Sequence, residues 1–192
     1  MTVKIPTRDE AFQLFKTYNS SESLTRHALA VEGVMRYFAE KYGEDVEMWG
    51  IIGLVHDIDY EKYPDEHCQK CREIFLEHNW PESYIRAVVS HGWGICSDVK
   101  PETRLEKTLY AVDELTGLIN SAVLVRPSRS VLDIKPKSVK KKWKDKRFAA
   151  GVDRSIIDKG AEMLEMDRTE LISETIMGMR TVADAIGLKG NL

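Results

Sequence analysis

An adjacent histidine and aspartate, His56 and Asp57, end an apolar stretch in the first third of the chain. Every residue from Met48 to Val55 is apolar or glycine, so a helix there is hydrophobic on all sides and is expected to be buried. A buried carboxylate is unfavourable unless it is paired or bound to a metal. Imidazole and carboxylate both ligate first-row metals, so the doublet is a candidate metal site. The alternative is a buried histidine capped by its own aspartate.

Four more side chains of metal-ligating type lie on or beside apolar faces of expected helices: His27, His67, His91 and Asp113. Each has a simpler explanation when taken alone. His27 can be a histidine at the edge of the core, and His91 can interact favourably with the C-terminus of its helix. Taken together they are harder to explain separately, because helix bundles build metal sites from inward-facing histidines and carboxylates.

The elements that must position these side chains are all expected to be helices. Apolar spacing and capping residues predict helices over Pro6–Tyr18, Leu24–Tyr42, Asp45–Ile58, Asp65–His78, Pro81–His91, Pro101–Val125, from Ser138, and over Asp153–Leu164 and Asp167–Ile186. On the helix from Pro101, the solvated face is assigned to Glu106, Lys107 and Glu114. The chain shows no alternating strand pattern and no internal repeat, so the fold class is all-α.

Composition limits the function further. A hydrophobic fraction of 43% supports a sizeable core in a single domain over residues 1–192. The net charge of −3 gives no reason to expect nucleic-acid binding. No apolar run approaches the ~18 residues of a membrane span, and the N-terminus does not resemble a signal peptide. Three cysteines, Cys68, Cys71 and Cys96, indicate reduced thiols and a cytoplasmic location, and we expect them to be small core side chains rather than a zinc or redox site.

Residues 126–147 differ from the rest of the chain in charge. They contain ten Lys or Arg and two Asp, a net charge of +8, whereas the remaining residues carry −11. Such a segment is expected to be a solvated helix face, or to supply cations to phosphate groups. In the second case Lys140, Lys141 and Lys144 are the candidate substrate-binding residues.

Three phrases of the sequence together resemble the HD-domain superfamily of metal-dependent phosphohydrolases, in particular its HDIG-like subgroup. They are Leu-Thr-Arg-His-Ala-Leu-Ala-Val-Glu around His27, Gly-Leu-Val-His-Asp-Ile-Asp around His56 and Asp57, and Ala-Val-Asp-Glu-Leu-Thr-Gly around Asp113. The resemblance covers roughly residues 20–125, expected to be the HD-domain core. The basic segment 126–147 and the C-terminal helices 148–192 lie outside it.

The resemblance implies a ligand set and a cofactor. His27, His56, Asp57 and Asp113 would bind a first metal. In two-metal members two extra histidines follow the doublet, at the places of His67 and His91, and Asp57 would bridge the ions. The cofactor would be one or two divalent transition metals, Fe, Mn, Co, Ni or Zn, because histidine and carboxylate suit all of these.

The resemblance is incomplete after the doublet. The subgroup signature is His-Asp-Ile-Gly, often followed by Lys, whereas this chain has Asp59 and Tyr60. The missing lysine removes a phosphate contact, and Asp59 and Glu61 add carboxylates near the site. We expect Asp57 to hold the attacking water and consider Glu61 as a proton relay, or as a solvated side chain at a helix end.

The sequence therefore predicts a hydrolase acting on a small phosphorylated molecule, a nucleotide or a phosphomonoester, without a membrane partner. Two alternatives stay open: an HD-type di-iron oxygenase, which uses the same kind of ligand set, and a non-catalytic module that binds a nucleotide or a partner protein. The oligomeric state is open as well, with a homodimer as one option.

Overall fold

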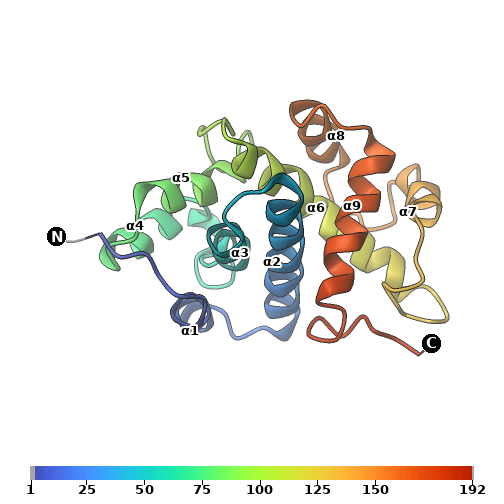
Figure 1. Ribbon diagram of the computed structural model, residues 1–192, viewed down its shortest axis with the longest axis horizontal. Coiled ribbons are helices and arrows are strands. Elements are labelled where there is room, and N and C mark those ends of the chain that lie inside the picture. The colour runs from blue at the N-terminus through green and yellow to red at the C-terminus, as the bar shows by residue number, and fades with distance from the viewer. Residues whose placement is uncertain (1–2, 192) are drawn as a thin grey trace.

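A computed structural model describes residues 3–191 of the chain. Within that range the secondary structure is helical, apart from an isolated bridge between Trp93 and Ser97. The helices are α1 (Arg8–Tyr18), α2 (Glu22–Tyr42), α3 (Val46–Val55), a 3₁₀ turn (Pro64–Glu66), α4 (Lys70–Glu77), α5 (Glu82–Ser90), α6 (Arg104–Leu124), α7 (Pro136–Trp143), α8 (Arg154–Met163) and α9 (Arg168–Thr181) (Figure 1). The expected all-α fold is confirmed.

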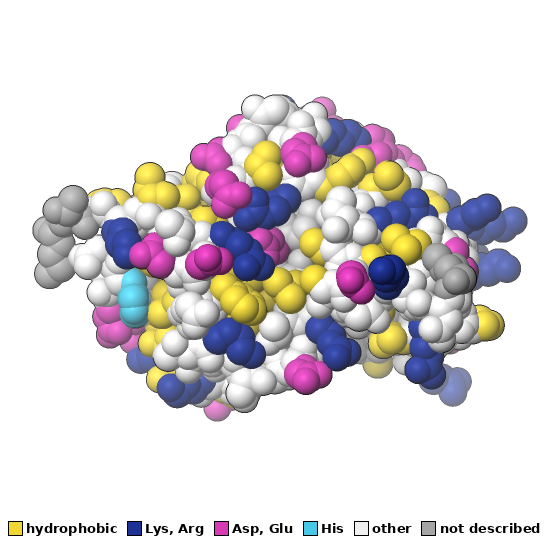
Figure 2. Space-filling model, turned by 60° about the horizontal axis from the view of Figure 1, so that its bottom comes forward, with side chains coloured by type: hydrophobic (Ala, Val, Ile, Leu, Met, Phe, Trp, Pro, Cys, Tyr) yellow, Lys and Arg dark blue, Asp and Glu magenta, His cyan; other side chains and the backbone are white. Residues whose placement is uncertain are grey.

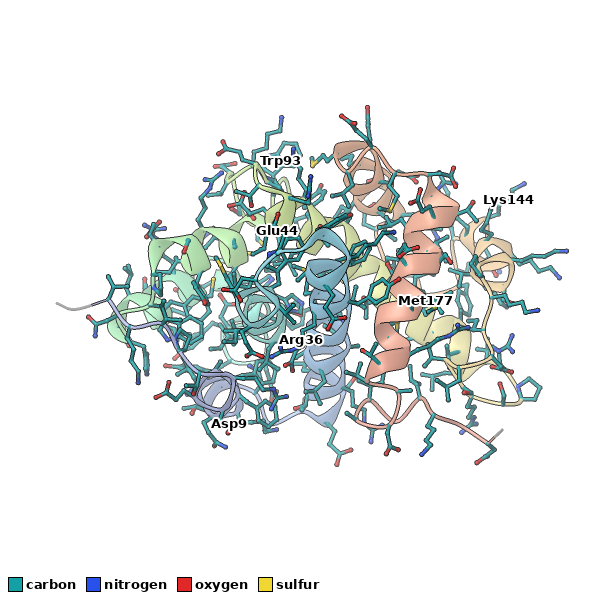
Figure 3. The ribbon with its side chains drawn as sticks, in the orientation of Figure 1. Asp9, Arg36, Glu44, Trp93, Lys144 and Met177 are labelled. Atoms are coloured by element: carbon teal, nitrogen blue, oxygen red, sulfur yellow. The ribbon has the colours of Figure 1, made fainter. Side chains whose placement is uncertain are left out.

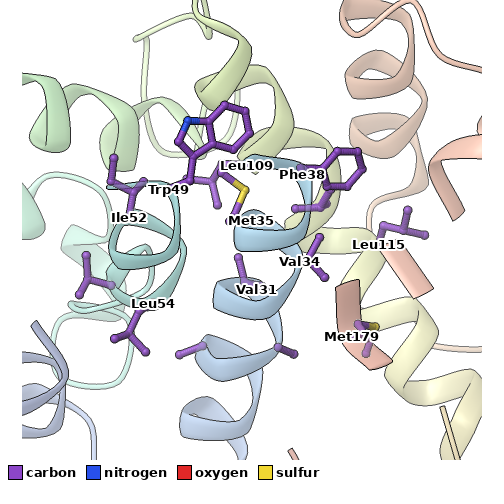
Figure 4. Close-up of a cluster of buried hydrophobic side chains, with 14 of the residues drawn as sticks. Val31, Val34, Met35, Phe38, Trp49, Ile52, Leu54, Leu109, Leu115 and Met179 are labelled. Carbon is purple, nitrogen blue, oxygen red and sulfur yellow. The ribbon is translucent and has the colours of Figure 1, made fainter. Parts of the chain in front are cut away.

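Helix α2 lies at the centre of the bundle, between α3 on one side and α9 on the other, and α6 crosses behind it (Figure 1). Its buried side chain Met35 lies beside Trp49 of α3 in the core, and Val31 and Ile52 belong to the same buried cluster (Figure 4). Burying an aliphatic or aromatic side chain of this size contributes about 1.5–3 kcal/mol. The helix that carries His27 and the helix that ends just before the His56–Asp57 doublet are therefore held together by core packing.

Capping residues account for most helix boundaries. Thr7 and Thr103 each form a capping box, with Glu10 and Glu106 respectively, at the start of α1 and α6. Gly43 ends α2 in the left-handed conformation with φ 69°, which glycine adopts without steric penalty. These boundaries lie within three residues of those expected from the sequence.

Two expected helices are each five residues shorter at one end, and the helix expected over Asp45–Ile58 ends three residues early, at Val55. The helix expected over Asp65–His78 is a 3₁₀ turn followed by α4, because Cys68 takes a left-handed conformation with φ 67° between them. The free N–H of Cys71 in the first turn of α4 donates to the buried carboxylate of Asp59 at 2.8 Å. The last helix ends at Thr181 rather than at Ile186.

Helix α8 approaches α6 closely at Gly160. A Cβ added at Gly160 would lie 2.5 Å from both Cα and Cβ of Ala111. Gly160→Ala is therefore expected to push α8 off α6 and to lower the free energy of unfolding by about 1–3 kcal/mol, measured by urea denaturation. The matched variant Gly117→Ala on α6 meets only Val152 at 3.6 Å and should be neutral or stabilising. Equal stability of the two variants would contradict this explanation.

None of the helices described here is long and apolar enough to cross a membrane.

Candidate metal centre

The His56–Asp57 doublet lies immediately after α3, the most apolar helix of the chain. Helix α3 ends at Val55, and the His56 ring beyond it is fully buried. The Nδ1 atom of this ring donates to the carbonyl of Gly53 at 2.8 Å. A carbonyl oxygen can only accept, so the neutral ring carries its proton on Nδ1 and leaves the lone pair on Nε2. This lone pair faces the other side chains of the site.

The first ligand group consists of His27, His56, Asp57 and Asp113, which come from α2, from the end of α3 and from α6. One potential ligand atom from each lies within 4.8 Å of all the others. His27 Nε2 is 2.9 Å from Asp113 Oδ1 and 3.2 Å from His56 Nε2. His56 Nε2 is in turn 3.3 Å from Asp57 Oδ2. Residues separated by 86 positions in sequence therefore meet at one point.

The second ligand group consists of Asp57, His67 and His91. Asp57 Oδ1 is 3.5 Å from His67 Nε2 and 3.5 Å from His91 Nε2. Its other oxygen, Oδ2, faces His27 and His56. Asp57 thus presents one oxygen to each group, which is the arrangement needed for a carboxylate that bridges two cations.

The potential ligand atoms of the second group are suited to bind a cation rather than to hydrogen-bond to one another. His67 Nδ1 is hydrogen-bonded to Asp59 Oδ1 at 2.7 Å, and His91 Nδ1 donates to the carbonyl of Val88. With Nδ1 protonated, each neutral ring directs the lone pair of Nε2 at a carboxylate oxygen of Asp57. Two acceptors that face each other need a proton or a metal between them. Hydrogen bonds from Nδ1 of this kind orient histidine ligands in known metal sites.

The carboxylates of the site remain ionised despite their burial. Burial raises the pKa of Asp57, but the charge of His56 and hydrogen bonds from the histidines outweigh it, so this pKa lies well below its ordinary value. The pKa of Asp113 is lowered by the same competition, with His56 and His27 opposing burial. Burial lowers the pKa of His56, yet the charges of Asp57 and Asp113 hold it well above its ordinary value. The two carboxylates therefore favour positive charge beside them, whether it is a proton on His56 or a cation.

A cavity of about 370 Å³ opens onto both ligand groups. Among its lining residues is Glu114, which sequence reasoning placed on the solvated face of its helix. The assignment of Glu114 to a solvated face was wrong, because its side chain is half-buried next to Asp113. Burial, and then the charge of Asp113, raise the pKa of Glu114 to about 7. In the sequence, only its position directly after Asp113 indicated that Glu114 lies near the site. Glu106, assigned to the same face, is also buried, where Arg86 pairs with it at 3.1 Å.

Glu61, considered as a proton relay, lies elsewhere. Its carboxylate accepts hydrogen bonds from the backbone N–H groups of Ser20 and Ser21, both at 2.9 Å, and from the Ser20 hydroxyl. It lines neither of the two cavities that reach His27. Glu61 therefore holds the loop in front of α2, and the partners that keep it there are some 40 residues away in sequence. Asp59, by contrast, is fully buried and supports His67.

The structure does not bring Lys140, Lys141 and Lys144 to the ligand groups. They belong to α7 and its C-terminal end, which pack on α6 and α9, and Lys140 Nζ donates to Thr169 at 2.8 Å. None of the three lines a cavity that includes His27. Lys144 lies at the outer end of the molecule in Figure 3, where Lys and Arg side chains gather in Figure 2. The basic segment is a solvated face in this structure.

The three thiols are free, and Cys68 and Cys71 are buried as expected. Cys96 is only partly buried and lines the cavity beside His67 and His91. His67, Cys68 and Cys96 also place potential ligand atoms within 4.8 Å of one another. The thiols of Cys68 and Cys96 thus lie against His67 of the second ligand group.

Comparison with known families explains the arrangement. The model of the HD domain matches residues 24–122, which is just over half of the chain. The chain belongs to the HD-domain family. HD domains are generally metal-dependent phosphohydrolases that bind divalent metals, and the buried His and Asp groups described above could hold such a metal. The matched residues include His27, the doublet and Asp113. No solved structure matches the chain significantly.

Proposed function

We propose that this HD-domain protein hydrolyses a small phosphorylated substrate, a phosphomonoester, with the help of two divalent transition-metal ions. The observation that supports the proposal most strongly is Asp57, whose two oxygens face two separate groups of histidine nitrogens. His27, His56 and Asp113 would complete the first metal site, and His67 and His91 the second.

The residues of the chain would prepare the reaction in two ways, around the chemistry that a bound metal supplies. A divalent cation, when bound, lowers the pKa of a water molecule and polarises a phosphoryl oxygen. Asp57 would orient that water, because it is the one carboxylate that faces both groups. The carbonyls of Gly53 and Val88 and the carboxylate of Asp59 fix the rotation of three histidine rings, so that their Nε2 atoms point inward.

Substitution of Asp59 tests the second metal site. Asp59→Asn leaves an acceptor for only one of two donors, His67 Nδ1 and Cys71 N, and an unsatisfied buried donor costs about 1–3 kcal/mol. Without its hydrogen bond to Asp59, the His67 ring is no longer held in one orientation. The affinity of the second site for its ion should therefore fall about 10- to 100-fold. Isothermal titration with Mn²⁺ should show one weakened site and one unchanged site. Equal weakening of both sites would contradict the division into two groups.

The proposed function is tested by metal analysis and a substrate panel. Full-length protein purified without chelator should contain about two equivalents of transition metal, and it should release phosphate from phosphomonoesters when supplied with Mn²⁺, Fe²⁺, Co²⁺ or Ni²⁺. No hydrolysis of any phosphomonoester or phosphodiester would refute the proposal. Two irons with a mixed-valence signal and oxygen consumption would favour an oxygenase. Nucleotide binding that survives loss of the metal would favour a binding module.

A further inference from the structure

A second and larger cavity, of about 670 Å³, adjoins the metal centre. The two cavities share four lining residues, Leu24, His27, Gly117 and Gly151. A molecule whose phosphate lies at the ligand groups can therefore extend past His27 into the larger cavity. Its volume is within the ~300–1,000 Å³ of ordinary small-molecule sites.

The exposed surface of this cavity is mostly apolar, and Glu22, Ser23, Asn120 and Ser121 add polar groups to its lining. Six of the side chains that form it are Leu24, Ala30, Val152, Met179, Ile186 and Leu188. Among the residues described here, its lining contains no Phe, Tyr or Trp, and its one aromatic ring, His27, belongs to the first ligand group. A nucleobase in the cavity would therefore find no Phe, Tyr or Trp on which to stack. The hydroxyl of Thr116 is already used, since it donates to the carbonyl of Val112 at 2.6 Å. The cavity is thus suited to the burial of hydrocarbon.

The charges of the cavity do not suit a second phosphate group. Arg26 is the only Lys or Arg among the lining residues, and its guanidinium is paired with Glu22 at 3.1 Å. The cations of α7 lie outside the cavity. A substrate with further anionic groups beyond the one at the metal centre would find a single cation among the lining residues, Arg26, with the carboxylate of Glu22 beside it.

The cavity depends on parts of this chain outside the matched HD domain. Ala149, Gly151 and Val152 precede α8, Met179 belongs to α9, and residues 186–188 follow α9. The segment after α9 returns beside the N-terminal half of α2 (Figure 1), where Gly187 approaches the Arg26 side chain. Much of the lining of the cavity therefore comes from segments that follow the matched HD domain.

Resting on the proposed phosphomonoesterase function, we propose that the larger cavity binds the hydrocarbon part of the substrate. The substrate would be the phosphate monoester of an uncharged aliphatic alcohol, with its single phosphate at the metal centre. Hydrolysis breaks the bond between phosphorus and the ester oxygen, adds water, and yields the free alcohol and inorganic phosphate.

A series of linear alkyl phosphates tests this assignment with full-length, metal-loaded protein. From ethyl to hexyl phosphate, kcat/KM should rise about fourfold per methylene, the value expected for burial of one CH₂ group. Hexyl phosphate should be a better substrate than any nucleoside monophosphate. In calorimetry, the non-hydrolysable hexylphosphonate should bind more tightly than ethylphosphonate, with a more negative heat-capacity change.

Substitutions on α6 test whether the dependence of kcat/KM on alkyl chain length arises in the cavity. Ser121→Phe fills the cavity from a partly buried position on its wall, and it should reduce kcat/KM for hexyl phosphate at least tenfold while that for ethyl phosphate changes less than threefold. Ser83→Phe, at an exposed position of α5 outside the cavities described here, is the matched control and should change neither. Gly117→Ala, whose added Cβ would meet only Val152 at 3.6 Å, is the second variant should Ser121→Phe fail to fold, and it should shorten the preferred chain length.

The outcomes separate the two proposals. Absence of hydrolysis with every substrate, together with unchanged alkylphosphonate selectivity, would remove the proposed function and leave the apolar binding site. Hydrolysis that is independent of chain length, or that favours nucleoside monophosphates, would overturn the present inference and leave the phosphohydrolase intact. A loss of hexylphosphonate selectivity in Ser83→Phe as large as in Ser121→Phe would also overturn it.

Discussion

Replacing Asp57 by asparagine is expected to abolish metal-dependent hydrolysis. Asp57 contributes Oδ2 to the first ligand group and Oδ1 to the second, within 3.5 Å of three histidine nitrogens. Asparagine has nearly the same shape but a neutral amide, so it can neither bridge two cations nor balance their charge. The cation contributes several kcal/mol to the transition state, and a loss of about 4 kcal/mol lowers kcat about a thousandfold. Metal content and phosphate release measure the two effects.

The control for this variant is Glu61→Gln, the second carboxylate that the sequence suggested for catalysis. Glu61 is hydrogen-bonded to Ser20 and Ser21, so its substitution should leave metal content unchanged and alter kcat less than threefold. Both variants should keep a helical circular dichroism spectrum. If Glu61→Gln lost activity as fully as Asp57→Asn at full metal occupancy, the assignment of Glu61 to the α2 loop would be wrong.

The sequence predicts the helices and the convergence of the six metal-type side chains well, for a physical reason. Each of them lies at a definite place in a strong local pattern: His27 beside an apolar stripe, and His56 and Asp57 after a run of eight apolar residues or glycines. Burial then decides their direction. The structure indeed brings His27, His56, Asp57 and Asp113 together, and places His67 and His91 on the other side of Asp57.

The sequence does not predict contacts that depend on side-chain geometry between distant segments. Glu61 is close to the doublet in sequence, yet its carboxylate is hydrogen-bonded to the backbone N–H groups of Ser20 and Ser21 in front of α2 rather than placed at the ligand groups. Asp59 has an equally polar side chain, but the backbone at Cys71 and the ring of His67 enclose it completely. The basic segment was linked to the site only by its charge. Packing of α7 on α6 and α9 puts that charge outside both cavities.

Removing the metal is expected to destabilise the protein substantially. Without a cation, the inward-facing Nε2 atoms and the carboxylates of Asp57 and Asp113 must share protons in a buried site. A metal that binds only the folded state stabilises it by about 2.7 kcal/mol at 100 times its dissociation constant. For a chain of 192 residues, this raises the melting temperature by about 5–11 °C. Differential scanning calorimetry of chelated and Mn²⁺-loaded protein measures the shift, and the Asp57→Asn variant should show almost none.

The stabilisation by metal should also depend on pH, with a sign set by His56. The pKa of His56 in the folded, metal-free chain lies well above its ordinary value of 6.5. Protonation of this ring therefore stabilises the metal-free fold fully below about pH 6.5, and the contribution is lost as the pH rises through the raised pKa. Metal binding requires the ring to be deprotonated. The rise in melting temperature on adding Mn²⁺ should thus be larger at pH 8 than at pH 6, and a larger rise at pH 6 would show that His56 is not a ligand.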